Sequence, residues 1–254
     1  MITSASFYMA AIPAVALVGL SKGGFSGVGL LALPLLALVV SPVQAAAIML
    51  PILLAQDAVS VYAYRASFDR LNLIRLVPGA CIGIALGYLL AAYVSDAAVS
   101  LALGVISISF AVRQWWRSRG GAVPPQSQPG VVSGWFWGGV SGFTSMIAHA
   151  GGPPFQVYTL PQRMAPLVYA GTTSMFFATL NVIKVAPYFW LGQFTTENLA
   201  TAAVLCPLAI VSTWAGVQLV RRVSADRFYI AIYALLFLVG AKLMWDGVTG
   251  IFSA

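Results

Sequence analysis

The chain has 254 residues, of which 60% are hydrophobic and only 7% are charged. A soluble protein of this size needs a charged surface, so the composition excludes a soluble globular protein and indicates an integral membrane protein. The formal net charge of +7 comes from cations spread along the chain, which we interpret as signals of membrane orientation, and we expect no nucleic-acid partner.

The first apolar segment, residues 5–40, is too long to cross a bilayer once. As one helix it would measure about 54 Å, whereas the hydrocarbon core is about 30 Å thick. Near its middle, residues 19–29 read GLSKGGFSGVG and combine five glycines with Lys22. Such a stretch lowers helix propensity, and non-helical backbone at membrane depth lies within protein or along a wet cavity. The sequence therefore predicts two half-helices at this break. Residues 1–18 lack a basic region, so we expect no secretory signal.

This break is expected to bind an anion. Backbone N–H groups at the start of a half-helix carry partial positive charge, and Lys22 adds a full charge. We predict that Lys22, Gly23, Gly24, Gly27 and Gly29 line a substrate site. Two alternatives remain open: Lys22 extends to the membrane interface, or the glycines serve close helix packing.

The second segment, residues 43–64, carries two polar residues of interest. Gln44, in its first turn, is a candidate hydrogen-bond donor to the substrate. Asp57 lies about fourteen residues into the span, where a carboxylate is costly and often relays protons. We predict that Asp57 couples transport to protons. A structural ion pair with Lys22 or Lys184 is the alternative.

The next two segments, residues 72–93 and 97–117, have the length of about 20 residues that crosses a bilayer once. They are followed by the polar, turn-rich stretch GGAVPPQSQPG at residues 120–130. We interpret this stretch as a linker that divides the chain near its middle.

The fifth segment, residues 131–161, is again too long for one crossing and is interrupted by AHAGGPP at residues 148–154. We predict a second pair of half-helices here, with His149, Gly151 and Gly152 at the substrate site. His149 is also a second candidate for the coupling proton, because an imidazole titrates near neutral pH.

The remaining apolar segments have single-crossing length and cover residues 166–190, 198–220 and 228–250. Thr172, Thr173 and Ser174 supply hydroxyl groups that can donate to oxyanion oxygens. The competing interpretation is that these hydroxyls bond to carbonyls four residues earlier in their own helix.

The two halves of the chain align at an offset of 124 residues. Residues 41–57 then lie over residues 165–181, Asp57 pairs with Asn181, and the two breaks coincide. We interpret this as a duplication. The predicted domains are a first repeat at residues 1–119, the linker at 120–130 and a second repeat at residues 131–254.

Charge placement sets the expected orientation of the repeats. If the fifth segment enters the membrane and returns, every basic loop falls on one side, as the positive-inside rule requires, and the two halves are inverted. The predicted fold is therefore an all-α polytopic membrane protein. It has two inverted repeats of about four helical segments each, with the first segment of each repeat broken or re-entrant. Inverted repeats with broken helices are typical of secondary transporters.

These features resemble the sulfite exporter TauE/SafE family. The glycine pattern from Gly19 to Pro34, the following SPVQAAA turn and a second copy after the linker carry the resemblance, which extends over about residues 7–250. It implies a carrier of sulfite, sulfoacetate or other organosulfonates in the bacterial inner membrane. It also implies that Lys22 and the glycines of both breaks line the anion site. The second half departs from the pattern, because HAGGPP replaces a fuller glycine run, and this bears on substrate choice more than on fold.

We therefore predict a multi-pass carrier that moves a small sulfur oxyanion across the cytoplasmic membrane, with protons and the lipid bilayer as its other partners. A homo-oligomer is left open. An anion channel would use the same helix dipoles without saturation or proton coupling. A structural subunit would tolerate loss of every polar residue in the membrane.

We expect no enzymatic activity, cofactor or metal site. One histidine and two separate cysteines, Cys81 and Cys206, offer neither a nucleophile beside a base nor a cluster of metal ligands.

Overall fold

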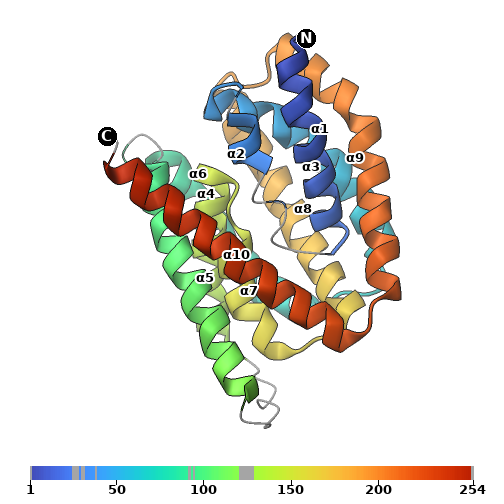
Figure 1. Ribbon diagram of the computed structural model, residues 1–254, viewed down its shortest axis with the longest axis vertical. Coiled ribbons are helices and arrows are strands. Elements are labelled where there is room, and N and C mark those ends of the chain that lie inside the picture. Colours follow the sequence, from blue (N-terminus) through green and yellow to red (C-terminus); the bar gives the residue numbers. More distant parts are fainter. Residues whose placement is uncertain are drawn as a thin grey trace. The chain divides into compact units, whose positions relative to one another are not determined.

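The computed structural model describes residues 2–24, 29, 32–37, 39–90, 93, 95–119 and 129–252. Within these ranges the regular secondary structure is helical, and Figure 1 labels the α-helices. The helices, in chain order, are α1 (Ala5–Lys22), α2 (Ala32–Ala37), α3 (Pro42–Tyr64), α4 (Arg70–Leu90), α5 (Asp96–Arg119), α6 (Val131–Ala148), α7 (Gly152–Thr159), the 3-10 helix η2 (Leu160–Gln162), α8 (Pro166–Trp190), α9 (Thr196–Arg222) and α10 (Ala225–Phe252).

Six helices in the described ranges are long and apolar enough to cross a membrane. They are α1, α3, α4, α8, α9 and the part of α10 from Tyr233 to Ile251. The all-α, multi-pass membrane class predicted from the sequence is therefore confirmed.

Both predicted interruptions are present. The first long segment is divided between α1, which ends at Lys22, and α2, which begins at Ala32. After α1, Gly24 has a φ of +134°, a backbone conformation that side chains rarely allow. The fifth segment is divided between α6 and α7. There His149 adopts a left-handed φ of 49° after the last turn of α6, and prolines near the start of α7 need no N–H partner.

Contacts divide the chain into two compact units, and each unit combines helices from both halves of the sequence. Unit 1 comprises Met1–Leu73 and Pro166–Ser224, with α1, α2, α3, α8 and α9. Unit 2 comprises Ile74–Ala165 and Ala225–Ala254, with α4 to α7 and α10. The predicted repeats at residues 1–119 and 131–254 thus contribute helices to both units, and the duplication itself stays a prediction.

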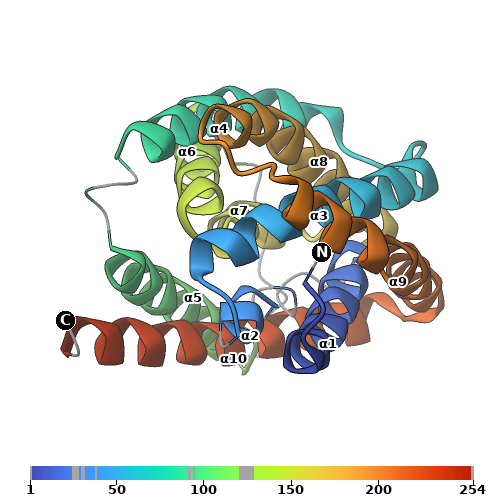
Figure 2. The ribbon, with the colours of Figure 1, turned by 90° about the horizontal axis from the view of Figure 1, so that it is seen from above.

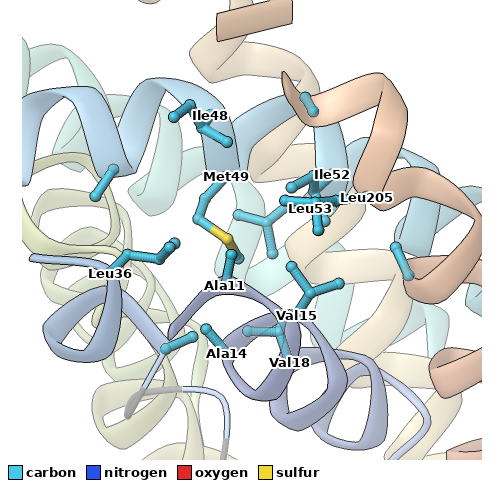
Figure 3. Packing of buried hydrophobic residues seen from close by; sticks show 14 of the residues in the cluster. Ala11, Ala14, Val15, Val18, Leu36, Ile48, Met49, Ile52, Leu53 and Leu205 are labelled. Carbon is cyan, nitrogen blue, oxygen red and sulfur yellow. The ribbon is translucent and has the colours of Figure 1, made fainter. Parts of the chain in front are cut away.

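In unit 1, α1 packs closely on α9. Gly19 lies against Ser212 and Gly23 lies against Gly216, so the two helices run parallel in register. Small residues at such contacts allow two backbones to approach each other. An apolar cluster continues this packing toward α3, where the Met49 side chain extends toward α1 (Figure 3).

The helix α3 packs on α8 as well as on α9 (Figure 2). Asp57 contacts Asn181, while Tyr64, further along α3, lies near Gly171, which is earlier in α8. The two helices are therefore antiparallel. They are also the helices that the 124-residue offset makes equivalent, and an inverted repeat requires this opposite direction.

In unit 2, α5 and α10 lie side by side (Figure 1). Gly250 lies near Ala97 and Gly240 lies near Gly104, so these helices are also antiparallel. Glycines of α4 and α6 similarly face each other's backbone. Close packing through small residues is thus common to both units.

Candidate functional site

The charged residues predicted to lie inside the membrane meet in unit 1. The Nζ of Lys22 lies 2.5 Å from Oδ1 of Asp57, and these side chains are only 11% and 5% exposed. The Nδ2 of Asn181 donates to Oδ2 of Asp57 over 2.6 Å. Each carboxylate oxygen of Asp57 therefore has its own donor, one from α1 and one from α8.

A second cation belongs to the same cluster. Lys184 lies about one turn beyond Asn181 on α8 and is 1% exposed. Its electrostatic neighbours are Lys22 and Asp57. The cluster, defined by Lys22, Asp57, Asn181 and Lys184 and called here the buried charge cluster, thus contains two amines and one carboxylate. The sequence indicates Lys184 only as a possible partner of Asp57, although its place one turn from Asn181 is a signal for a site residue.

The end of α1 holds Lys22 in this cluster. The N–H of Gly23 donates to the Gly19 carbonyl over 2.9 Å, and the hydroxyl of Tyr64 donates to the Gly23 carbonyl. Lys22 is the last residue of α1, where the helix dipole favours a cation. Its Nζ also lies 5.7 Å from the centre of the Phe177 ring, within cation–π range. Lys22 therefore points into unit 1 and does not extend to an exposed position.

Glycines of the first break allow close helix packing and an unusual backbone conformation. A side chain on Gly23 would overlap the backbone of Gly216, and Gly24 needs its positive φ. Gly29 lies beside Ser21, and Gly27 lies outside the described residues. Their contribution to a substrate site stays a prediction, while helix packing explains Gly23 directly.

The three predicted hydroxyl donors are buried in α8. Thr172, Thr173 and Ser174 each donate to the carbonyl four residues earlier, over 2.7 to 2.8 Å. Thr172 also accepts the N–H of Asp69 over 2.9 Å. A hydroxyl has one proton, so each would have to rotate before it could donate to an anion. Their role in substrate binding stays a prediction.

Gln44 lies apart from the buried charge cluster. It stands thirteen residues before Asp57 on α3, a separation of about 20 Å along a helix. Its Nε2 lies 3.4 Å from Oδ1 of Asn198. A direct contact with substrate at the cluster would require another arrangement of α3, and the prediction for Gln44 remains untested.

The second break lies in unit 2. His149 is half-buried, and two hydroxyls of α6 donate to carbonyls of the break: Ser141 to Gly151 over 2.7 Å and Thr144 to Ala150 over 3.2 Å. Gly152 then begins α7. Because the two breaks belong to different units, a shared substrate site for His149, Gly151, Gly152 and the first break stays a prediction.

A surface groove and the potential metal ligands are the other possible sites. A groove of about 230 Å³ lies between the last turns of α3 and α9 and is lined by Tyr62, Ala63, Arg65, Ala66, Trp214 and Arg221. Among the described residues, no three histidine, cysteine, aspartate or glutamate side chains are grouped so that they could hold a metal ion. The buried charge cluster is therefore the strongest candidate site.

Interrupted helices and charges buried between apolar spans define a multi-pass membrane protein of the transporter class. The chain belongs to the sulfite exporter TauE/SafE family, whose family model matches residues 11–243. This family consists of membrane transporters of the sulfite-exporter type. No curated protein and no solved structure matches the chain.

Proposed function

We propose that this protein is a secondary transporter that moves sulfite or an organosulfonate, such as sulfoacetate, across the bacterial cytoplasmic membrane with proton coupling. The observation that carries the proposal is the buried charge cluster at the end of the interrupted helix α1. Membership in the TauE/SafE family supports the sulfur-containing substrate.

Burial of the charges in this cluster is energetically unfavourable, which favours a functional role for it. Ionisable groups within a membrane are expensive to bury and commonly mark ion or substrate pathways. Here the charges come from the ends and interiors of apolar helices, with Lys22 on α1 and Lys184 on α8. An oxyanion offers several acceptor oxygens to such amines, whereas a neutral solute would gain little from them.

Asp57 suggests how a proton enters the cycle. Its carboxylate accepts from Lys22 and from Asn181. Protonation of Asp57 removes the negative charge that faces Lys22, so the ammonium becomes available to an anion. In the proposed cycle the proton and the anion therefore bind together. His149 is the second candidate for a titrating group.

Alternating access in this proposal uses the two inverted repeats. The antiparallel directions of α3 and α8 in unit 1, and of α5 and α10 in unit 2, support an inverted relation of the halves. In transporters of this kind, the substrate site lies near the midplane where repeats meet. The contact between the equivalent residues Asp57 and Asn181 fits such a position.

Flux measurements on purified protein in liposomes test the proposal. Uptake of radiolabelled sulfite or sulfoacetate should saturate with concentration and increase when a pH gradient is imposed. We expect Lys22→Gln to lower kcat/KM by about 10- to 100-fold, because a charge-assisted hydrogen bond contributes about 1.5–3 kcal/mol.

The matched control is Lys242→Gln. Lys242 also lies in an apolar span and pairs with an aspartate, Asp246, but this pair is exposed. The flux of the Lys242→Gln variant should equal that of the wild type. Flux that rises linearly without saturation would favour a channel, and wild-type flux after Lys22→Gln would remove the lysine from the mechanism. Absence of flux for every sulfur oxyanion would end the proposal.

A further inference from the structure

We propose that the groove between the last turns of α3 and α9 binds the headgroup of an anionic phospholipid. Arg65 and Arg221 line this groove together with the aromatic residues Tyr62 and Trp214 and two alanines, and all of these residues belong to unit 1. The lipid is a partner distinct from the transported anion, so the inference does not depend on the identity of the substrate.

The first step is the position of the groove, which lies where two apolar spans end. The helices α3 and α9 are both long and apolar enough to cross a membrane, and Arg221 donates to the Ala63 carbonyl over 3.4 Å near their common end. Arg65 follows the last residue of α3, and Arg221 is the penultimate residue of α9. Arginines at the ends of membrane spans extend to the interface, so the groove lies at the depth of the lipid phosphates.

The second step is the charge of the groove. Two guanidinium groups line it, and the described lining residues include no carboxylate. The ion pairs among the described residues are formed by Lys22 and Lys242 and involve neither of these arginines. Arginine stays protonated in proteins, so the groove attracts an anion from outside the protein.

The third step is the set of hydrogen-bond donors. The Cζ of Arg65 lies 4.2 Å from the centre of the Tyr62 ring, and its Nη1 donates to the Tyr62 carbonyl over 3.1 Å. Arg221 donates from Nη2 to the Ala63 carbonyl. A guanidinium has five N–H donors, so each arginine is oriented by the protein and retains donors for a ligand. Their planar fork matches the oxygens of a phosphate.

The fourth step is the apolar surface beside the arginines, which favours a lipid over a free anion. Trp214 lines the groove and lies two turns before Arg221 on α9. Both Trp214 and Val211, one turn earlier, have exposed side chains. Positions 211, 214, 218 and 221 follow each other at spacings of three and four residues, so they share one face of the helix. An acyl chain can lie along the apolar part of this face while its phosphate contacts Arg221.

The size of the groove fits a headgroup. Its volume of about 230 Å³ is below the range of about 300–1,000 Å³ that is typical of pockets enclosing a whole drug-sized ligand. The acyl chains of a bound lipid would therefore remain in the bilayer. Basic pockets between transmembrane helices recognise anionic lipid headgroups in this manner.

Titration of short-chain lipids into the purified full chain in detergent tests this site, with bound lipid measured by native mass spectrometry. The anionic probe is dioctanoyl phosphatidylglycerol. Dioctanoyl phosphatidylcholine has the same chains without net charge, and glycerophosphoglycerol is the same headgroup without chains. We expect the wild type to bind phosphatidylglycerol more tightly than either of the other probes by about 10-fold or more.

Arg65→Gln and Arg221→Gln should each weaken phosphatidylglycerol binding by about 10-fold or more, because each removes charge-assisted hydrogen bonds to the phosphate. The matched control is Arg222→Gln, which removes the same charge from an exposed neighbour that does not line the groove. General attraction to an anionic surface corresponds to about fivefold per arginine, and this control should lose no more than that. Thermal unfolding without lipid, measured in parallel, identifies a destabilised variant. Arg221→Lys, which keeps the charge, should retain part of the binding.

Equal losses in Arg65→Gln, Arg221→Gln and Arg222→Gln would overturn the inference, because they would indicate general attraction without a defined site. Equal wild-type affinity for phosphatidylcholine or for glycerophosphoglycerol would also overturn it, since recognition would then require no net charge or no acyl chain. Absence of sulfite or sulfoacetate flux would leave these binding measurements unchanged. Failure of the proposed function and failure of this inference are therefore distinguishable.

Discussion

Asp57 and Asn181 are equivalent positions in the predicted duplication, and their contact gives a physical reason for the difference between the two residues. They are separated by the 124-residue offset and are joined by a hydrogen bond of 2.6 Å. Two aspartates at these positions would place like charges together in an apolar interior. Asparagine keeps nearly the same shape and supplies a donor, so a single carboxylate remains to serve Lys22.

At the same scale, Tyr64 is expected to stabilise the end of α1. Its buried hydroxyl donates to the Gly23 carbonyl, which the interrupted helix leaves without an intrahelical partner. Tyr64→Phe should lower the free energy of unfolding by about 1–3 kcal/mol, because a buried carbonyl loses its donor. Thermal unfolding in detergent measures the effect. Tyr62→Phe is the control, since Tyr62 is 64% exposed and should change stability little. Equal effects of the two substitutions would contradict this role.

At the scale of elements, the break after α1 combines a helix end with a close helix contact. Gly23 closes the last turn of α1 by its N–H and also allows α1 to approach Gly216 of α9. Glycine at the break therefore does more than end a helix. It fixes the position of the preceding residue, Lys22, relative to α3 and α8.

We expect Gly23→Ala to separate α1 from α9, because the new methyl group would overlap the backbone of Gly216. Overpacking of this kind costs about 1–3 kcal/mol, and displacement of Lys22 should also lower anion affinity. Thermal unfolding and methanesulfonate titration measure the two effects. Gly139→Ala is the matched control, since the nearest atom to its methyl group would lie at an ordinary contact distance of 3.5 Å. Full stability and affinity in Gly23→Ala would contradict this assignment.

At the scale of the whole molecule, the sequence predicted the helical spans and both interruptions, because hydrophobic length and glycine or proline placement determine them locally. It also placed Asp57 and Asn181 at equivalent positions. It left an ion pair of Asp57 with Lys22 or Lys184 as an alternative and could not place the three side chains in one cluster, because such contacts depend on how α1, α3 and α8 pack. It likewise left open whether the hydroxyls of α8 bond within their own helix. Local pattern could not decide between that arrangement and an open donor.

The last prediction concerns the directions of the halves in the membrane. In unit 1, α3 and α9 run parallel, since Gln44 contacts Asn198 near their starts and Arg221 contacts Ala63 near their ends. Ser67 follows α3, and Ser224 follows α9, so both should lie on one side of the membrane, with the basic loops. Gln193 lies between α8 and α9, in the turn equivalent to that of Ser67.

Single cysteines at these three positions, in a chain whose Cys81 and Cys206 are replaced by alanine, test this orientation with a membrane-impermeant maleimide. Inversion of the halves predicts labelling of Gln193→Cys in intact cells, and labelling of Ser67→Cys and Ser224→Cys only after permeabilisation. The physical reason is that α9 crosses the bilayer once between Gln193 and Ser224, while the equivalent turns of inverted repeats face opposite sides. Labelling of Ser67→Cys and Gln193→Cys from the same side would show that the halves are not inverted, and the proposed alternating access would then lose its structural basis.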